Sequence, residues 1–223
     1  MFLARSLLLA GLPPAEQERL AARMRRQAYR RGEVVVRQGD PGLSLHVVLE
    51  GRLKVLVGAQ SGDEMLLAIL GPGDTFGEVA LLDGGPRSAT VVALEPSRTA
   101  SLSREDFVDL IRQSAAVRDG VLVALAGIIR RATDELADFV GLGLSGRLAK
   151  RLLALAQAHG QPVGGTIELT LPLTQAELAD MVGATRASVN QLLGSFEDRG
   201  AISRRGHRLV ILRPELLRYL AGD

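Results

Sequence analysis

The sequence predicts an α+β protein in three parts: an N-terminal antiparallel β-roll, a long helix, and a C-terminal unit of helices with a β-hairpin. Three observations support this. Short runs of β-branched residues alternate with glycine turns from residue 33 to 101, which is typical of antiparallel rolls and barrels. Apolar residues then recur with a helical period from 117 to 139. A helix, a glycine turn and a second helix follow from residue 174.

Composition excludes several classes of protein. The chain has 223 residues, of which 47% are hydrophobic and 23% charged, so it can bury a core and is not disordered. It has no cysteine, which excludes disulfides, thiol catalysis, zinc–thiolate sites and cysteine-ligated iron–sulfur clusters. Its aromatic content of 3% argues against a protein that stacks single-stranded bases.

The first predicted domain, residues 1–110, is the β-roll. It opens with a short helix over Pro13–Met24, where proline in the first turn costs no hydrogen bond. The strands are expected at Glu33–Arg37, Leu45–Glu50, Arg52–Val57, Met65–Leu70, Ala89–Leu94 and Arg98–Ser101.

The second predicted segment, residues 111–143, is a long helix and a hinge, within a stretch that is helical from about 104 to 142. One apolar stripe runs at steps of three and four, and Leu122, Ile129 and Val140 add a second. A helix with two apolar stripes packs on its own domain and on a second helix, which a symmetric partner supplies most simply. Burial inside one chain is the alternative. The first stripe consists of Val117, Val121, Leu125, Ile128, Ala132, Leu136 and Phe139.

The third predicted domain, residues 144–223, is a winged helix-turn-helix. A helix over Arg147–Ala158 and a strand-like run over Thr166–Leu171 come first. Thr174 and Glu177 then form a capping box that starts a helix. Gly183 permits a tight turn, and Thr185 caps the next helix. The runs Ile202–Arg204 and Arg208–Leu212 are expected to pair as a β-hairpin, the wing.

Positive charge gathers on this third part. Residues 1–144 carry 17 Lys and Arg against 18 Asp and Glu, whereas residues 145–223 carry 10 against 7, a net of +3. A basic surface on a helix-turn-helix and its wing is typical of duplex DNA binding; a solvated charged face is the alternative. The candidate DNA-binding residues are Thr174, Gln175, Thr185, Arg186, Ser188, Asn190, Gln191, Arg204, Arg205 and His207.

A second candidate site lies in the run from Phe76 to Val91. Arg87 can hold a phosphate through its guanidinium fork, and Ser88 with backbone N–H groups can complete an anion site. Glu78 can accept a hydrogen bond from a ribose hydroxyl. Together these groups suit a nucleoside phosphate, although Glu78 and Arg87 could instead form a structural ion pair.

At this point the sequence resembles the cyclic AMP receptor protein and fumarate–nitrate regulator (CRP/FNR) superfamily of bacterial transcription factors. The resemblance covers nearly the whole chain. It implies that Gly77, Arg87, Ser88 and Ala89 hold a cyclic phosphate, with Val79 beside them and Glu78 on the ribose. The segments that carry it are Leu8–Leu12, Arg31–Glu33, Gln38–Asp40, Phe76–Leu82, Arg87–Val91, Gly146–Ala149 and the helix-turn-helix.

The resemblance has two departures from the family pattern. The family places adjacent hydroxyl residues on the long helix to contact adenine, whereas here only Thr133 follows Ala132. The family's recognition helix has an arginine, a neighbouring glutamate and a further arginine one turn on, where this chain has Arg186, Ala187 and Gln191. We therefore expect a changed operator half-site in which Arg186 still reads guanine.

The resemblance implies a homodimeric regulator that is not an enzyme. Cyclic AMP is expected to bind between the β-roll and the long helix and to act as an allosteric effector, with no metal. The expected partners are a palindromic DNA operator and RNA polymerase. One alternative is a regulator of the same family that binds DNA without ligand or senses another molecule. A metalloenzyme of the cupin type and a structural dimer adaptor are more remote alternatives.

No segment is expected to cross a membrane. The run Leu7–Leu9 is short, and the apolar stretch over Val121–Ile129 has about half the length that a bilayer requires. We therefore expect a cytoplasmic protein without a secretory signal.

Overall fold

The computed structural model describes residues 2–6, 8–58, 64–171, 173–205 and 208–222. Contacts divide the chain into two compact units, Met1–Arg130 and Arg131–Asp223. This border falls inside a helix that the sequence assigns to a segment of its own. The three-part division at 110 and 143 therefore stays a prediction.

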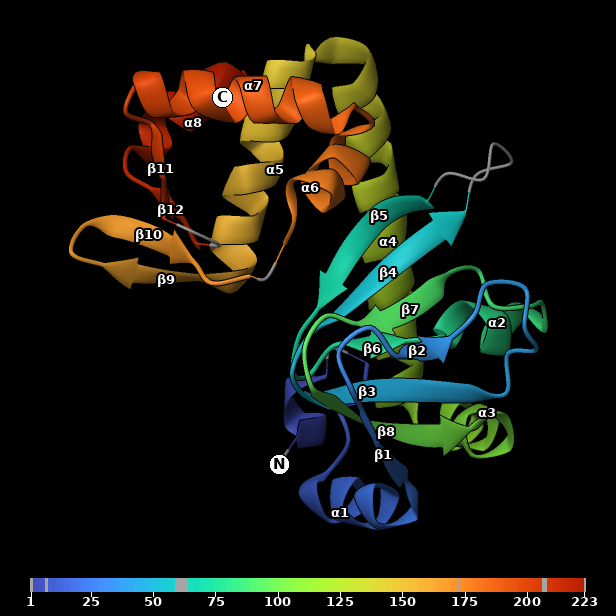
Figure 1. Ribbon diagram of the computed structural model, residues 1–223. Helices are drawn as coiled ribbons and strands as arrows, with labels where there is room; N and C mark the ends of the chain where they lie inside the picture. The colour runs from blue at the N-terminus through green and yellow to red at the C-terminus, as the bar shows by residue number, and fades with distance from the viewer. Residues whose placement is uncertain (1, 7, 59–63, 172, 206–207, 223) are drawn as a thin grey trace. The chain divides into compact units, whose positions relative to one another are not determined.

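The first unit contains two four-stranded antiparallel sheets (Figure 1). One has the order β1-β8-β3-β6 and the other the order β2-β7-β4-β5. This is the expected β-roll, so the antiparallel fold class is confirmed. The first sheet consists of β1 (Arg25–Tyr29), β8 (Ser97–Ser103), β3 (Ser44–Glu50) and β6 (Thr75–Phe76), and the second of β2 (Val34–Val36), β7 (Thr90–Ala93), β4 (Leu53–Gly58) and β5 (Glu64–Leu70).

Strand β3 is buried on both faces. Leu45 and Val47 belong to a cluster with the surrounding helices, while Val48 belongs to a second cluster with residues of both sheets. Successive side chains of a strand point to opposite faces, so β3 is covered by helices on one side and by a sheet on the other. His46 faces the same side as Val48 and stacks on Phe76 of β6, with ring centroids 4.8 Å apart.

Helices cover one face of the first sheet. The 3-10 helix η1 (Phe2–Arg5) and α1 (Pro14–Arg23) precede the strands, and α3 (Arg104–Gln113) and α4 (Ala115–Gly141) follow them. Phe107 of α3 is fully buried, and Val117 and Val121 of α4 pack in the same cluster. The continuous helical stretch expected from 104 to 142 is two helices, because Ser114 has an extended backbone (φ −117°, ψ 113°).

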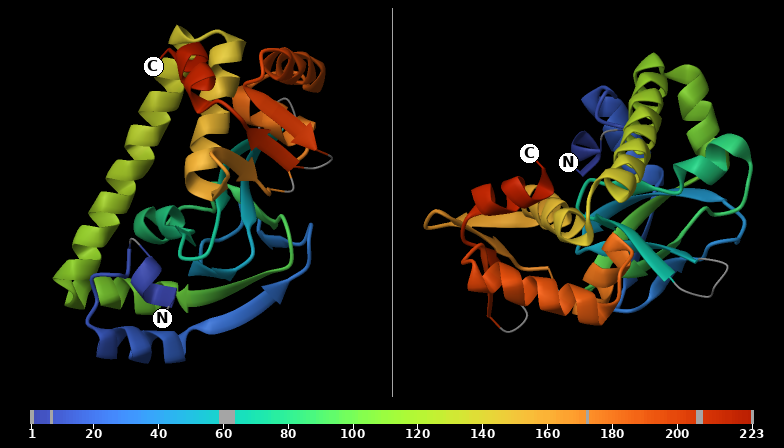
Figure 2. Two further views of the ribbon diagram at one scale, coloured as in Figure 1. Left: turned by 90° about the vertical axis from the view of Figure 1, so that its left-hand side faces the viewer. Right: turned by 90° about the horizontal axis from the view of Figure 1, so that it is seen from above.

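Helix α4 leaves much of its length exposed. Figure 2 shows this helix along its full length. Only its first turns carry the buried residues Val117 and Val121, whereas Leu122, Ile129, Leu136 and Phe139 are exposed. Despite these residues, no helix in the described parts of the chain is long and apolar enough to span a bilayer.

The second unit is a winged helix-turn-helix with a four-stranded antiparallel sheet of order β11-β12-β10-β9. Leu148 and Leu152 of α5 and Phe196 of α7 form part of its buried interior. Gly183 ends α6 in the left-handed region (φ 63°), as expected for the tight turn. The elements are α5 (Leu144–His159), β9 (Gly160–Val163), β10 (Thr166–Leu169), α6 (Gln175–Val182), α7 (Arg186–Asp198), β11 (Ile202–Arg205), β12 (Arg208–Ile211) and α8 (Pro214–Ala221).

Phe107 tests the importance of the helix-covered face. Replacing Phe107 with alanine removes a fully buried ring and should lower the free energy of unfolding by about 3–5 kcal/mol. The change Leu43→Ala is the control, since Leu43 is 68% exposed and should change stability by less than about 0.5 kcal/mol. Urea unfolding followed by circular dichroism measures both, and equal losses would contradict this packing.

Candidate functional site

Gly77 makes a turn that no other residue fits. It joins β6 to the short helix α2 (Glu78–Asp83) and has a φ of +90°, a region that favours glycine. A Cβ atom here would lie 2.2 Å from Nη1 of Arg87 and 2.9 Å from the backbone oxygen of Ser44. The glycine therefore permits both the turn and the close approach of the arginine.

Arg87 is a buried cation held by neutral acceptors. Its side chain donates from Nη1 to the backbone oxygen of Gly77 (3.2 Å) and from Nη2 to Oγ of Ser44 (3.1 Å). Burial lowers the pKa of Arg87, while the nearby carboxylates of Glu78 and Asp40 oppose that effect. A guanidinium stays charged in proteins and has five N–H donors, so this group is suited to hold an anion.

His46 extends this arrangement into the sheet. Its Nε2 lies 2.9 Å from the Ser44 hydroxyl, and its Nδ1 lies 3.5 Å from the hydroxyl of Thr99. Burial and the charge of Arg87 lower the pKa of His46 to about 4. The imidazole is therefore neutral at pH 7, and the Ser44 hydroxyl can accept from Arg87 and donate to His46. Sequence reasoning missed Ser44, which no local motif marks.

The other residues of the predicted nucleotide site surround Arg87 along the chain. Glu78 and Val79 form the first turn of α2 and are half-buried, Ser88 is exposed, and Ala89 is half-buried just before β7. Thr133 is exposed on the part of α4 that belongs to the second unit. The structure thus brings Gly77, Glu78 and Arg87 together, and the roles of all these residues stay predictions.

The second helix of the helix-turn-helix, α7, has one buried and one exposed face. Val189 and Leu193 are buried in the unit, together with Phe196. Arg186, Asn190 and Gln191 are exposed. Arg186 and Asn190 are four residues apart and therefore lie on one side of the helix, whereas Gln191 directly follows Asn190 and is turned about 100° from it.

Two threonines begin the helices of this motif. Thr174 forms the expected capping box with Glu177, and its hydroxyl both accepts from the Glu177 amide and donates to the Glu177 carboxylate. Thr185 caps α7 by accepting from the amide of Ser188, and the two hydroxyls lie 2.9 Å apart. Both predicted caps are confirmed.

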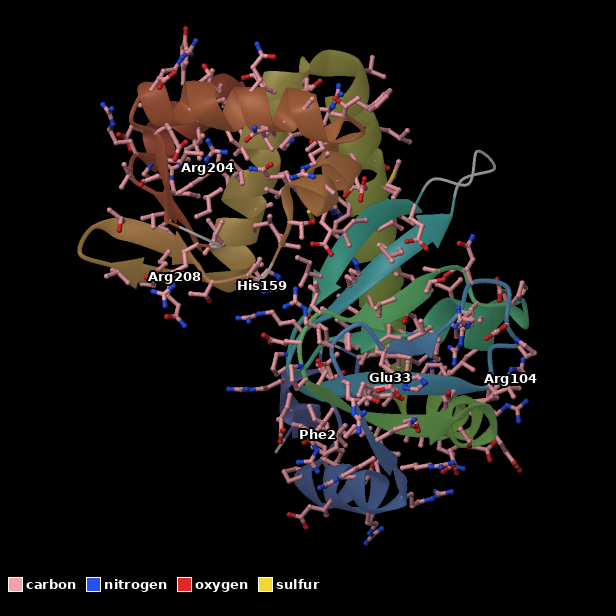
Figure 3. All side chains as sticks on the ribbon, viewed as in Figure 1. Phe2, Glu33, Arg104, His159, Arg204 and Arg208 are labelled. Atoms are coloured by element: carbon pink, nitrogen blue, oxygen red, sulfur yellow. The ribbon has the colours of Figure 1, made fainter. Side chains whose placement is uncertain are left out.

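The wing is tied to α7 by polar contacts. Arg204 of β11 donates to Glu197 and to Asn190, and Gln175 of α6 donates to the same Asn190 oxygen. Sequence reasoning placed Gln175, Asn190 and Arg204 at the site but missed Glu197. Arg204 and Arg208 come from neighbouring strands of the hairpin (Figure 3). Arg205 lies in β11, and His207 lies outside the described residues.

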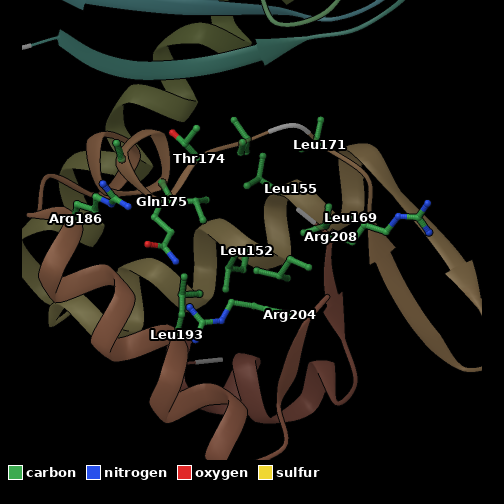
Figure 4. A pocket seen from close by; sticks show the side chains of 14 residues that line it. Leu152, Leu155, Leu169, Leu171, Thr174, Gln175, Arg186, Leu193, Arg204 and Arg208 are labelled. Carbon is green, nitrogen blue, oxygen red and sulfur yellow. The ribbon is translucent and has the colours of Figure 1, made fainter. Parts of the chain in front are cut away.

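A pocket of about 520 Å³ lies beside α7 in the second unit, not at Arg87. Figure 4 shows leucines on its walls, among them Leu152 and Leu193, with the polar ends of Gln175 and Arg204 close together. Both leucines are fully buried in the core of the unit. Gln175 and Arg204, in contrast, are half-buried.

His46 should make the stability of the first unit depend on pH. Its folded pKa of about 4 lies below the ordinary value of 6.5, so between these values only the unfolded state gains the proton. The contribution of His46 to the free energy of unfolding is present in full above pH 6.5 and is lost as the pH drops toward 4. From pH 7 to 5 the loss should be about 2 kcal/mol, measured by urea unfolding. The variant His46→Gln should lack this component, and equal pH dependence in both proteins would contradict it.

Comparison with known proteins identifies two domains. The model of the cyclic nucleotide-binding domain matches residues 26–114. The model of the Crp-like helix-turn-helix domain matches residues 146–220. These matches coincide with the sheets around Arg87 and with the winged unit. The chain therefore carries a cyclic nucleotide-binding domain and a DNA-binding domain.

Relatives match over most of their length. A CRP-like cAMP-activated global transcriptional regulator of Mycobacterium tuberculosis is 35% identical over 96% of both chains. A cyclic AMP receptor protein of Thermus thermophilus is 34% identical over 88% of both. FixK2 of Bradyrhizobium japonicum shares the fold, with a TM-score of 0.79 at 21% identity over 90% of this chain and 98% of the other. The chain belongs to the CRP/FNR family of transcription regulators, which bind DNA and are not enzymes.

Proposed function

We propose that this protein is a homodimeric transcription regulator whose binding to a palindromic DNA operator is controlled by cyclic AMP. The observation that carries the proposal is the buried Arg87 guanidinium, which neutral acceptors hold beside the Glu78 carboxylate. The names of the relatives from M. tuberculosis and T. thermophilus support cyclic AMP as the effector.

Each group around Arg87 has a proposed part in binding the nucleotide. The guanidinium pairs with the cyclic phosphate, because charge-assisted hydrogen bonds to phosphate are strong and the fork geometry fits two oxygens. Ser88 and the backbone at Gly77 and Ala89 complete the anion site, with Val79 beside it. Glu78 accepts from the ribose hydroxyl. Thr133 is the proposed contact to adenine.

Arg87 tests the nucleotide site. The wild-type protein should release or absorb heat with cyclic AMP in isothermal titration, and cyclic GMP serves as the comparison. Arg87→Leu should weaken cyclic AMP binding by at least about 10- to 100-fold, since hydrogen bonds to a charged group contribute about 1.5–3 kcal/mol.

The control is Arg98→Leu, which removes an equal charge from an exposed ion pair with Glu50 in the same domain. It should bind cyclic AMP like the wild type. If the wild-type protein binds neither nucleotide, the cyclic-nucleotide part of the proposal fails. DNA affinity measured with and without cyclic AMP then separates a nucleotide-controlled regulator from one that binds DNA without ligand.

The homodimer rests on the exposed stripe of α4. Leu122 and Leu136 are 61% and 69% exposed, and Ile129 lies midway between them. The seven-residue spacing is the heptad repeat of coiled coils, in which two helices bury a shared apolar seam. A second copy of α4 would cover this stripe, and a dimer would present two recognition helices to two half-sites of an operator.

The dimer can be tested on this stripe. Leu122→Glu and Leu136→Glu place charges in the seam and should convert a dimer into a monomer in sedimentation velocity. Val123→Glu is the matched control, because Val123 is also exposed (58%) but is turned about 100° away from Leu122. A wild-type monomer, or the same response from all three variants, would contradict this seam.

The DNA complex follows from the faces of α7. Its exposed side would enter the major groove, where Arg186 reads guanine through O6 and N7. The wing arginines would contact phosphates and make binding weaken with salt. Such a regulator would act in the cytoplasm, where it meets DNA and RNA polymerase.

A further inference from the structure

We infer that Asn190 presents only its amide NH₂ group to DNA and therefore reads guanine instead of adenine. The basis is the contact between three side chains from three elements: Asn190 of α7, Gln175 of α6 and Arg204 of β11. The inference rests on the proposed function, because it assumes that the exposed face of α7 enters the major groove.

Arg204 determines which end of the Asn190 amide faces the wing. Its Nη1 lies 2.8 Å from Oδ1 of Asn190. A guanidinium has donors and no acceptor, so the atom that faces it must be the amide oxygen. The reverse orientation would place two donors against each other. The hydrogen bond from Arg204 therefore determines which end of the Asn190 amide is the oxygen.

Gln175 strengthens the same orientation. Its Nε2 donates to Oδ1 of Asn190 at 3.0 Å. The oxygen thus accepts two hydrogen bonds, which uses both of its lone pairs. Because the amide is planar, its NH₂ group points away from Arg204 and Gln175, and Asn190 itself is exposed.

Arg204 is itself held firmly by α7. Its Nε and Nη2 donate to Oε2 of Glu197 at 2.8 and 2.6 Å, and its backbone amide donates to Oε1 at 2.7 Å. These hydrogen bonds lower the pKa of Glu197, so the carboxylate stays ionised near neutral pH. Glu197 and Asn190 lie two helical turns apart on α7, and Arg204 bridges them.

The orientation changes the base that Asn190 can read. An asparagine with a free amide pairs with adenine through an acceptor for N6–H and a donor for N7. With Oδ1 committed, only the two N–H donors remain. Guanine presents two adjacent acceptors, N7 and O6, in the major groove. The amide of Asn190 therefore matches a G·C pair and lacks the acceptor that adenine requires.

The experiment is selection from a random duplex pool with the full-length protein and cyclic AMP. The base pair that Asn190 reads is the one whose preference disappears in Asn190→Ala, and it should be G·C in the wild type. The double variant Gln175→Ala, Arg204→Met removes both donors to Oδ1 and frees the amide to rotate. The ratio of A·T to G·C at that pair should then rise by about tenfold.

Arg208→Met is the matched control. It makes the same change on the next strand of the hairpin, where the side chain bonds Glu168 instead of Asn190, and it should leave the G·C preference unchanged. Circular dichroism confirms that each variant is folded. An A·T preference in the wild type, or a double variant that keeps the G·C preference, overturns the inference.

The outcomes also separate this inference from the proposed function. If the wild-type protein selects no sequence, the proposed function fails. Alternatively, the wild-type protein selects a sequence in which Arg186→Ala removes the preference at one base pair while Asn190→Ala removes the preference at none. In that case, recognition of DNA by α7 stands and the inference about Asn190 is wrong.

Discussion

The buried charge of Arg87 is the constraint on which the first unit depends. A guanidinium that is 5% exposed must find acceptors close by, since burying a charge without partners is costly. It finds them on Gly77, which follows β6, and on Ser44, which begins β3. Those two segments are thereby drawn to the same place. Position 77 requires a glycine, because its backbone lies in the left-handed region and any side chain there would displace the arginine.

His46 connects this charge to the interior of the roll. It stacks on Phe76 and contacts the Ser44 hydroxyl that supports Arg87. A protonated imidazole at this point would be a buried charge with a second cation, Arg87, beside it, and the pKa of His46 is lowered first by burial and then by that repulsion. The position of the Arg87 guanidinium and the packing between the sheets therefore depend on each other, because β3 contributes to both.

The parts of the fold that local pattern determines could be predicted from the sequence. The β-branched runs became β2, β3, β4, β5 and β7, and both threonine caps are present. Strand β1 was missed because four of its five residues are exposed, so its sequence lacks the alternation of apolar and polar residues. It is a strand because it pairs with β8. Strand β9, which contains Pro162, and helix α8 were also missed. Ser44 could not be found because its partner Arg87 is 43 residues away.

Contacts between residues that are distant in sequence also limit what can be predicted for α7. Helical spacing shows which side chains of α7 are exposed, and Arg186, Asn190 and Gln191 all qualify. Spacing does not show which polar atoms are already used. The Asn190 oxygen is occupied by Arg204, 14 residues further on, and by Gln175, 15 residues before. A residue's preference for a base depends on its remaining donors and acceptors. On the proposed function, the base that α7 recognises would therefore depend on the wing and on α6 as well as on the helix itself.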